Sequence, residues 1–430
     1  MDDTGHEATA AGGAAPRSER ETRPMVDPFE LNLRHLRALM AVQEHGSITA
    51  AAEVVSLSQP ALTQGLAKLE RQFGYVLFER RSEGMVPTAM GIVVIDRVRA
   101  AIDHLAAGAK GLTRVFLHPD RLMTMTQLRA FLALADAGSF TSAATATGLS
   151  QTAVHRAVGD LEEVIGGELV ERRGRGVWLN PAGKRLARGT RLAIAEVIAA
   201  IAELGTEPGG ELIAFGALPL SRPLLVPTAM AKMAHEQPRA RFEVVEGSWR
   251  ELIEPLRDGR INVIVGALRP FAITDLHQHP LYEDRLVIAA GSQHPLAGPA
   301  MPTLATLASY PWIVGPANTP LRAEWERLFA GTTLPRTPIE CGSVMIIGRL
   351  LTEGQFLTLL SPDQVALQIR IGLLARVGEP LEDSRRLIGI TTRRSWRPTA
   401  MQRRFLDLLD EVAAEIKADT TAGVQRSDWV

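Results

Sequence analysis

A repeat constrains this sequence more than any other feature. Segments 33–91 and 125–183 align without a gap at an offset of 92 residues, and 22 of the 59 aligned positions are identical. Unrelated segments of average composition would share about 4. Leu57-Ser58-Gln59, for example, recurs as Leu149-Ser150-Gln151. We infer that the first half of the chain holds two copies of one folding unit.

Each copy has the pattern of three short helices followed by a wing. Leu36, Leu39 and Met40 recur at helical spacing, and Gly46-Ser47 ends one helix and offers a hydroxyl to begin the next. An alanine-rich helix and a tight turn follow, and Ser58 or Ser150 is placed to cap a third helix. This order predicts a helix-turn-helix in each copy, with wings at 78–88 and 170–180.

The repeat continues past each wing as a helix with one apolar stripe. Its positions, spaced alternately by three and four residues, are Ile95, Val98, Ile102, Leu105, Ala109 and Leu112 in the first copy and Ala187, Thr190, Ile194, Val197, Ile201 and Leu204 in the second. Such spacing is typical of helices that pair along a seam. Each unit is therefore predicted to be a winged helix-turn-helix plus a linker helix.

The ordered motifs of both units resemble the N-terminal domain of LysR-type transcriptional regulators. The matching stretches are Leu33-Arg34-His35-Leu36, Gly46-Ser47-Ile48-Thr49, Ser58-Gln59-Pro60-Ala61-Leu62-Thr63, Leu77-Phe78-Glu79-Arg80 and 88–91 in the first unit, and Gly138-Ser139-Phe140-Thr141, Ser150-Gln151, 169–172 and Asn180-Pro181-Ala182-Gly183 in the second. The resemblance implies sequence-specific DNA binding and regulation of transcription. The duplication departs from the usual architecture of that family, whose members have one such unit.

After residue 210 the pattern changes to short β-branched or leucine-rich runs that alternate with helical stretches. Candidate strands are 211–216, 241–246, 263–266, 285–290 and 312–315, and candidate helices include 222–235, 249–258 and 320–329. This alternation predicts an α/β domain with parallel sheets. The region resembles the effector domain of the same family. The resemblance implies a two-lobed fold like that of periplasmic binding proteins, with lobes that meet near Asp284 and Arg385.

The predicted fold class is thus mixed: two helix-rich winged units with linker helices, then a two-lobed α/β effector domain. The predicted boundaries are 1–30 for a disordered tail, 31–92 and 123–184 for the winged units, 93–115 and 185–206 for the linkers, 210–420 for the effector domain and 421–430 for a second tail. Lobe I is expected at about 210–284 and 386–418, and lobe II at about 285–385.

DNA contacts are expected on the outer face of each third helix and on the wings. Phosphate contacts supply much of the affinity for DNA, and contacts to base edges supply specificity. The candidate residues are Ser58, Gln59, Thr63, Gln64, Lys68, Arg80, Arg81, Ser150, Gln151, His155, Arg156, Arg172, Arg173 and Arg175. Helix capping and solvated surface charge are the alternative interpretations of these residues.

The second wing is expected to contribute more phosphate contacts than the first. Lys184, Arg185 and Arg188 follow it and add to its charge, whereas Glu79 and Glu83 oppose the arginines of the first wing. Neutralising the arginines of the second wing should therefore lower the salt dependence of DNA binding more.

A small-molecule effector is expected where strands of the α/β domain end, because ligands of open α/β sheets bind at the carboxyl ends of strands. The resemblance places the family's ligand residues at the Leu218 turn, Ser248, 266–268 and 341–344. The candidates are Leu218, Ser221, Ser248, Ala267, Leu268, Gly342 and Ser343. Arg222 and Arg269 would suit an anionic effector, and ordinary surface positions are the alternative.

Composition narrows the classes of partner. The formal net charge is −1, so any DNA-binding charge must be local. One cysteine, Cys341, excludes an intramolecular disulfide and suits a reducing cytoplasm, and no apolar run suggests a signal peptide or a membrane span. No cofactor is predicted. No metal site is predicted either, because His277, His279 and His294 have no cysteine or carboxylate at ligand spacing.

The sequence therefore predicts a cytoplasmic regulator whose partners are double-stranded DNA, a small effector and RNA polymerase, with homo-oligomerisation open and no membrane. One alternative is a constitutive regulator with a vestigial pocket. A cytoplasmic solute-binding receptor is a second, and two DNA-binding units argue against it. An enzyme built on the α/β half is a third, and it lacks an assembled nucleophile or acid–base set.

The two linkers lie in one chain with their seams in register, and Pro119 between them can turn the chain. We expect one seam to pack on the other within a single chain, with Ile95, Val98, Ile102 and Leu105 against Ile194, Val197, Ile201 and Leu204. That pairing would form a pseudo-dimeric reading head from one chain. Pairing of the same seams between two chains is one alternative, and packing of each seam against its own wing is another.

Overall fold

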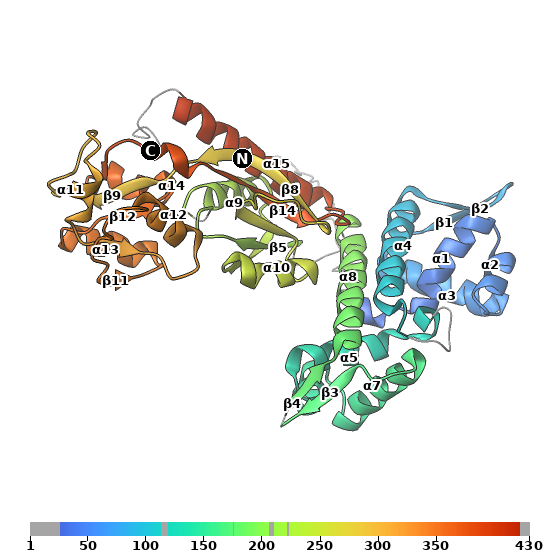
Figure 1. Cartoon of the computed structure of the whole chain (residues 1–430). Helices are drawn as coiled ribbons and strands as arrows, with labels where there is room; N and C mark the ends of the chain where they lie inside the picture. The colour runs from blue at the N-terminus through green and yellow to red at the C-terminus, as the bar shows by residue number, and fades with distance from the viewer. Residues whose placement is uncertain (1–25, 113–118, 175, 206–209, 222, 422–430) are drawn as a thin grey trace, which may run out of the picture.

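A computed structural model describes residues 26–112, 119–174, 176–205, 210–221 and 223–421 (Figure 1). Both expected tails fall largely outside these residues, as does part of the segment between the first linker and the second unit. Two winged units and two long helices form one end of the molecule, and the α/β domain forms the other (Figure 1).

The two winged units have the same order of elements. The first consists of α1 (Leu33–His45), α2 (Ile48–Val54), α3 (Gln59–Phe73), β1 (Phe78–Arg81), β2 (Gly84–Pro87) and the linker α4 (Ala89–Ala109). The second consists of α5 (Met125–Ala137), α6 (Phe140–Thr147), α7 (Gln151–Ile165), β3 (Val170–Arg173), β4 (Gly176–Leu179) and the linker α8 (Pro181–Glu203). In each unit the two strands form an antiparallel hairpin, which is the predicted wing.

Identical residues of the repeat make identical hydrogen bonds. The Oε1 atom of Glu70 accepts from the backbone N–H of Leu77 at 2.8 Å, and Oε1 of Glu162 accepts from that of Leu169 at 2.7 Å. Each carboxylate thereby fixes the start of a wing on its third helix. Burying such a backbone donor without an acceptor would cost about 1–3 kcal/mol, which accounts for the repeated Leu-Glu pair.

Gly91 and Gly183, at the same repeat position, let each linker helix pass close to the start of its wing. A Cβ atom at Gly91 would lie 2.0 Å from the carbonyl oxygen of Leu77, and one at Gly183 would lie 2.1 Å from that of Leu169. No side chain fits at these distances, so glycine is required by the close approach rather than by a positive φ.

The linkers begin earlier than predicted, at residues 89 and 181 instead of 93 and 185. Thr88 and Asn180 accept hydrogen bonds from the backbone N–H groups of Gly91 and Gly183, so each helix starts directly at the end of its wing. They also end earlier, at Ala109 and Glu203. Leu112 therefore lies beyond α4, although it packs against the same core.

Helices α4 and α8 lie side by side and run antiparallel within the one chain (Figure 1). Ile95, Val98 and Leu105 of α4 and Ile194, Val197 and Ile201 of α8 are buried in a single apolar core that also includes both winged units. A Cβ atom at Gly108 would lie 3.0 Å from the Cα of Gly189, so the backbones nearly touch at that end of the seam. The structure thus has the intrachain pairing that the sequence suggested.

Lobe I of the effector domain has a five-stranded sheet in the order β6-β5-β7-β14-β8. Its elements are β5 (Leu212–Ala217), α9 (Leu225–Glu236), β6 (Arg241–Glu246), α10 (Trp249–Arg257), β7 (Val263–Ala267), β8 (Leu276–Asp284), β14 (Arg386–Arg393) and α15 (Ala400–Thr421). Helices α9 and α15 bury one face of the sheet around Phe215 and Phe405. Leu252 and Leu256 of α10 cover the opposite face.

Lobe II contains α11 (Leu304–Ala308), α12 (Pro320–Leu328), α13 (Val344–Glu353) and α14 (Pro362–Arg370). Its strands are β9 (Val287–Gly291), β10 (Ile313–Val314), β11 (Ile339–Glu340), β12 (Thr358–Leu360) and β13 (Leu374–Val377). They form a sheet in the order β12-β9-β13 and the parallel pair β10–β11.

The prediction of parallel sheets is correct only in part. Strands β5, β6 and β7 are parallel, but β14 runs antiparallel to β7 and β8, and β12 and β13 run antiparallel to β9. The reason is that the chain passes between the lobes twice. Strand β9 leads into lobe II from the crossing, β12 and β13 run back toward it, and β14 re-enters lobe I.

The crossing between lobes is held by Asp284, near the predicted position. Its Oδ2 atom accepts from the guanidinium of Arg386 at 2.7 Å, and its Oδ1 atom accepts from the hydroxyl of Ser361 at 3.1 Å. Burial raises the pKa of Asp284, and the cation of Arg386 opposes that shift. One carboxylate therefore connects the end of β8, the start of β14 and the N-terminus of α14.

Candidate functional site

The outer faces of α3 and α7 carry the predicted DNA-binding side chains. Ser58, Gln59, Thr63, Gln64 and Lys68 are all exposed. The hydroxyl of Ser58 accepts from the N–H of Ala61 at 3.3 Å and caps α3. The inner face of α3 is buried through Leu62, Leu66 and Leu69. Packing thus fixes which face of the helix is exposed, and it is the face predicted to contact DNA.

The corresponding residues of α7 are also exposed, but their chemistry differs. Ser150 caps the helix by accepting from the N–H of Ala153 at 3.1 Å, as Ser58 does in α3. His155 stands where Thr63 does and stacks on Phe140 of α6 with ring centroids 4.7 Å apart, and Arg156 stands where Gln64 does. Gln151, His155 and Arg156 all face solvent. The two reading faces have one frame and different side chains.

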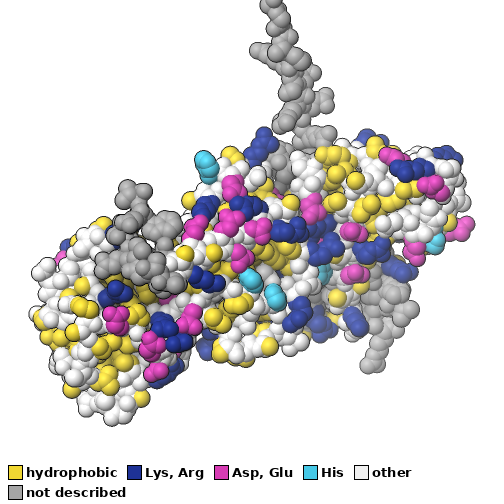
Figure 2. Space-filling model, turned by 90° about the horizontal axis from the view of Figure 1, so that it is seen from above, with side chains coloured by type: hydrophobic (Ala, Val, Ile, Leu, Met, Phe, Trp, Pro, Cys, Tyr) yellow, Lys and Arg dark blue, Asp and Glu magenta, His cyan; other side chains and the backbone are white. Residues whose placement is uncertain are grey.

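The wings keep part of their predicted charge. Arg80, Arg81 and Arg172 are exposed, and Arg81 pairs with Glu79 at 2.9 Å. The side chain of Arg173 and the whole of Arg175 lie outside the described residues. On the face shown in Figure 2, basic and acidic side chains are interspersed over the middle of the surface instead of forming one broad basic face. That the DNA-binding charge is local stays a prediction from the net charge of −1.

Arg188 does not belong to the second wing, contrary to prediction. Its guanidinium donates to Glu254 at 2.6 Å and to Asp258 at 2.8 Å, and both acids lie on or next to α10 of the effector domain. Position 188 lies on the face of α8 that packs on lobe I, about two helical turns after α8 begins. The sequence could not place this face because the acids lie 66 and 70 residues away.

The predicted effector residues of lobe I gather at the carboxyl ends of β5, β6 and β7. Leu218 follows β5 and its N–H donates to the carbonyl of Val265 at 2.9 Å, and Ala267 and Leu268 stand at the end of β7. Ser248 is exposed at the start of α10, and its hydroxyl and N–H both donate to Glu251 at 2.7 Å. Ser221 is fully buried with its hydroxyl bonded to two carbonyls, so its role is to hold the Leu218 turn.

The predicted residues of lobe II lie at the matching end of the pair β10–β11. Gly342 and Ser343 follow β11 and are both exposed, and Ser343 is the N-cap of α13. The Cβ position of Gly342 is 3.5 Å from Pro316, which follows β10. Each lobe thus presents its predicted residues at the carboxyl ends of strands.

Arg269, which the sequence suggested for an anionic effector with an ordinary surface position as the alternative, lies over the ring of Trp249, the residue after Ser248. The guanidinium carbon of Arg269 lies 4.8 Å from the ring centroid of Trp249. Its Nε atom is buried without a hydrogen-bond partner in the described residues, and burial lowers the pKa of the guanidinium. A half-buried cation whose Nε lacks an acceptor among the described residues is suited to bind an anion.

One cluster of functional candidates was missed by the sequence: Arg97, Glu196, Glu203 and the loop after β14. Arg97 of α4 is 4% exposed and donates to Glu196 at 2.9 Å and to Glu203 at 2.6 Å, both on α8. It also donates to the carbonyl of Arg397 at 2.7 Å. The signal that could have revealed it is a charged residue directly beside the seam position Val98.

Comparison with known proteins decides the family. A model of the LysR substrate binding domain matches residues 207–414. A model of the bacterial regulatory helix-turn-helix protein of the lysR family matches twice, at 33–92 and at 125–184, with both ends offset by 92 residues. The HTH-type transcriptional regulator GalR of Pseudomonas putida is 30% identical over 374 residues, which are 86% of this chain and 94% of that protein.

The chain belongs to the LysR-type transcriptional regulators. It is a DNA-binding regulator whose C-terminal domain binds small-molecule effectors. PcaQ of Agrobacterium fabrum is a further relative, 26% identical over 310 residues, 71% of this chain and 99% of that protein. The solved structure of ArgP from Mycobacterium tuberculosis shares the fold with a TM-score of 0.55 at 19% identity, over 67% of this chain and 96% of that one. No helix in the described part of this LysR-type chain is long and apolar enough to cross a membrane.

Proposed function

We propose that one chain of this LysR-type regulator forms a complete two-headed DNA reader. The observation that carries the proposal is the antiparallel packing of α4 on α8, which places both winged units on one apolar core. The two third helices then take the roles that two identical subunits have in a symmetric helix-turn-helix dimer. The protein would act in the cytoplasm, as a regulator and not as an enzyme, with RNA polymerase as a further partner.

The operator would be an imperfect palindrome, because the two reading faces differ. The amide of Gln64 can pair with the N6 donor and N7 acceptor of adenine. The guanidinium of Arg156 can pair with the O6 and N7 acceptors of guanine. Two other exposed positions of the repeat also differ: Thr63 corresponds to His155, and Lys68 corresponds to Asp160. The half-sites would lie about one helical turn, or a multiple of it, apart.

Footprinting on the chain's own promoter, followed by base substitution in each half-site, tests this proposal. Gln64→Ala should relax base preference in one half-site and Arg156→Ala in the other, each by about 1–3 kcal/mol of discrimination. Each variant is the control for the other. Loss of preference in both half-sites with either variant would mean that each head contacts both half-sites through a second copy of the chain.

The effector is proposed to be a small anion held between the lobes. Ser248, the carboxyl ends of β5 and β7, and the desolvated guanidinium of Arg269 support this assignment. A thermal-shift screen of small carboxylates against their neutral amides would identify a binder. Its affinity, measured by calorimetry, should fall in Arg269→Gln and in Ser248→Ala, while effector-free DNA binding stays nearly unchanged. Equal binding of acid and amide would contradict the anionic assignment.

A further inference from the structure

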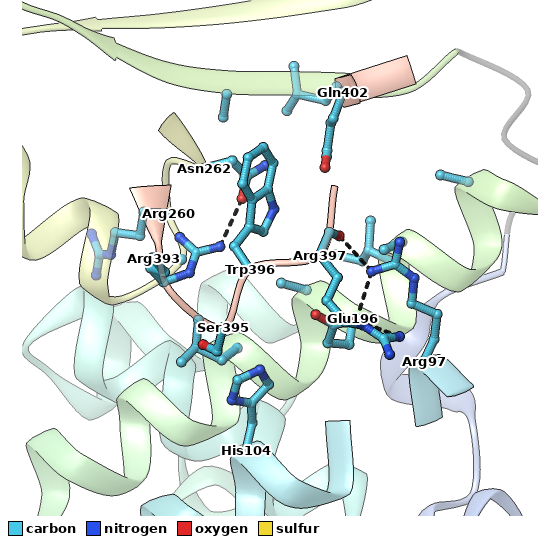
Figure 3. A pocket seen from close by; sticks show the side chains of 18 of the residues that line it. Arg97, His104, Glu196, Arg260, Asn262, Arg393, Ser395, Trp396, Arg397 and Gln402 are labelled. Atoms are coloured by element: carbon cyan, nitrogen blue, oxygen red, sulfur yellow. Dashed lines mark hydrogen bonds and ion pairs between the residues drawn. The ribbon is translucent and has the colours of Figure 1, made fainter. Parts of the chain in front are cut away.

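A cavity of about 210 Å³ lies where the linker helices meet the effector domain (Figure 3). We call it the junction cavity. Its walls come from three parts of the fold: Arg97 and His104 of α4, the face of α8 around Ala195 and Ala199, and an effector-domain wall that includes Arg393 and residues 395–397. None of the residues predicted to bind DNA or the effector lines it.

The charged side chains around the junction cavity are mostly cations. Four arginines line it, Arg97, Arg260, Arg393 and Arg397, against two acids, Glu196 and Glu211. Burial lowers the pKa of His104, so this imidazole is neutral at pH 7. The lining residues alone carry a formal charge of +2, four cations less two anions, but Arg97 also pairs with Glu203 and Arg260 with Asp136, two acids that do not line the cavity. That leaves Arg393 and Arg397, the latter 3.7 Å from Glu196.

Arg393 is the least compensated of these cations. It is 8% exposed, and its guanidinium donates to the carbonyls of Leu256 and Ile261 at 2.6 and 2.8 Å and to the amide oxygen of Asn262 at 3.2 Å. These neutral acceptors use three of the five N–H groups of an arginine. Burial lowers the pKa of Arg393 to about 10, which still leaves it charged near pH 7. A buried cation without a carboxylate partner is costly, and a bound anion would relieve that cost.

Asn262, Ser395 and Gln402 add polar groups to the lining, and the other lining residues are mostly apolar. The apolar lining includes Leu192, Ala195, Ala199 and Ala202 of α8 and the indole of Trp396, and Ile198, which also lines the cavity, is 43% exposed. A dry apolar cavity of about 150 Å³ is known to hold one benzene molecule. The junction cavity therefore has room for one ring and a small charged group, and both kinds of wall that such a molecule needs.

We propose that the junction cavity binds a small amphipathic anion, a carboxylate on an apolar body the size of one ring, at a site separate from the effector site between the lobes. The carboxylate would lie toward Arg393 and Arg397, and the apolar body between Trp396 and the alanines of α8. Because the walls belong to both linker helices and the effector domain, such a ligand stabilises one orientation of the reading heads relative to lobe I. Binding there and DNA binding are then linked reciprocally.

Benzoate is the probe that tests the site, with neutral benzamide as its isostere. The full chain carrying Arg269→Gln serves as the background, so that binding between the lobes is removed from the measurement. In calorimetry, benzoate should bind this protein with a stoichiometry near one and at least tenfold more tightly than benzamide. Adding Arg397→Gln or the cavity-filling Ala199→Phe should lower the affinity for benzoate at least tenfold.

Arg394→Gln is the matched control, because Arg394 is an exposed arginine three residues before Arg397 that does not line the junction cavity. It should leave benzoate affinity unchanged. The proposal is overturned by no benzoate binding in this background, by equal affinity for benzamide, or by an affinity that Arg397→Gln leaves intact. Arg397→Gln decides the question even where Ala199→Phe alters the melting temperature, since the Arg397 side chain is 44% exposed and its substitution disturbs no core packing.

Discussion

The first winged unit and the second share their internal hydrogen bonds but attach differently to the rest of the molecule. The first reaches the effector domain through α4, where Arg97 donates to the carbonyls of Arg397 and Pro398. The second is tied along α8, where Arg188 and Arg191 pair with Asp258, and through Asp136, which pairs with Arg260. The second unit is therefore joined to lobe I by side-chain ion pairs, and the first by hydrogen bonds to backbone carbonyls.

The seam between the linkers shows what duplication allows. In a symmetric pair, both ends of an antiparallel seam must use the same residues. Here Arg97 occupies the repeat position of Gly189, and Glu196 occupies that of His104. One end of the seam has become a buried ion cluster that contacts the effector domain, and the other has become a close backbone contact between glycines. Two copies in one chain can diverge where two identical chains cannot.

The largest expected effect comes from breaking the charged end of the seam. Arg97→Met leaves Glu196 buried at 6% exposure, and the ion pair that remains to it among the described residues is the longer one to Arg397, at 3.7 Å. Removing one partner of a buried ion pair typically costs roughly 3–5 kcal/mol. Denaturant unfolding of the full chain should show a loss of that size in the transition of the DNA-binding end. Arg99→Met, an exposed site on the same helix, should change stability by less than about 1 kcal/mol. Equal effects of the two variants would show that the buried cluster contributes nothing.

The second-largest loss of stability is expected from a substitution at the end of the seam where Gly108 and Gly189 meet. A Cβ at Gly189 would lie 2.6 Å from the carbonyl oxygen of His104 and 2.8 Å from the Cα of Gly108, so Gly189→Ala must push the helices apart. Overpacking of this kind costs about 1–3 kcal/mol. The matched control is Gly159→Ala in α7, where a Cβ meets nothing within 4 Å. That substitution should stabilise the protein by about 0.5–1 kcal/mol through helix propensity. A melting temperature that rises in both variants would contradict the close helix contact.

The smallest expected effect is a difference between the two wings. It should appear in the salt dependence of DNA binding and not in protein stability. Neutralising Arg172, Arg173 and Arg175 should flatten the slope of log affinity for DNA against log salt more than neutralising Arg80 and Arg81, by about one for each lost phosphate contact. The first wing has less to lose because Arg81 already pairs with Glu79. Arg188→Gln should leave the slope nearly unchanged, since its guanidinium faces α10. An equal or reversed effect of the two wings would reject the difference between them.

Much of the fold could be predicted because the decisive patterns are local. The cap residues, the Leu-Glu pairs and the alternating seam act within a few residues of one another, and duplication displays each of them twice. The strand ends that carry Ser248 and Leu268 follow from the same local patterns. What the sequence could not supply was the partner of each charged residue across the fold. Arg97, Arg188 and Arg393 meet groups that lie tens to hundreds of residues away, so periodicity says nothing about them.

The prediction of parallel strands throughout the effector domain was wrong for a related reason. Alternation of strands and helices favours parallel sheets only where the chain stays in one sheet. Asp284 and Arg386 mark the two points where it passes from one lobe to the other, and β14 runs antiparallel to β7, as β12 and β13 run antiparallel to β9. A local reading of 285–290 or 386–393 contains no information about that crossing.

Complementation between chains tests the central claim most directly, that α4 pairs with α8 of the same chain. Two full-length variants, Arg97→Glu and the double variant Glu196→Arg with Glu203→Arg, each place like charges at the seam. They are produced separately and together in the same cell, and operator binding is measured by gel shift. Intrachain pairing predicts that the co-produced pair binds no better than the separate variants, while one chain carrying all three substitutions recovers binding. Recovery in the co-produced pair would mean that the seam forms between chains, and the single-chain reading head would be wrong.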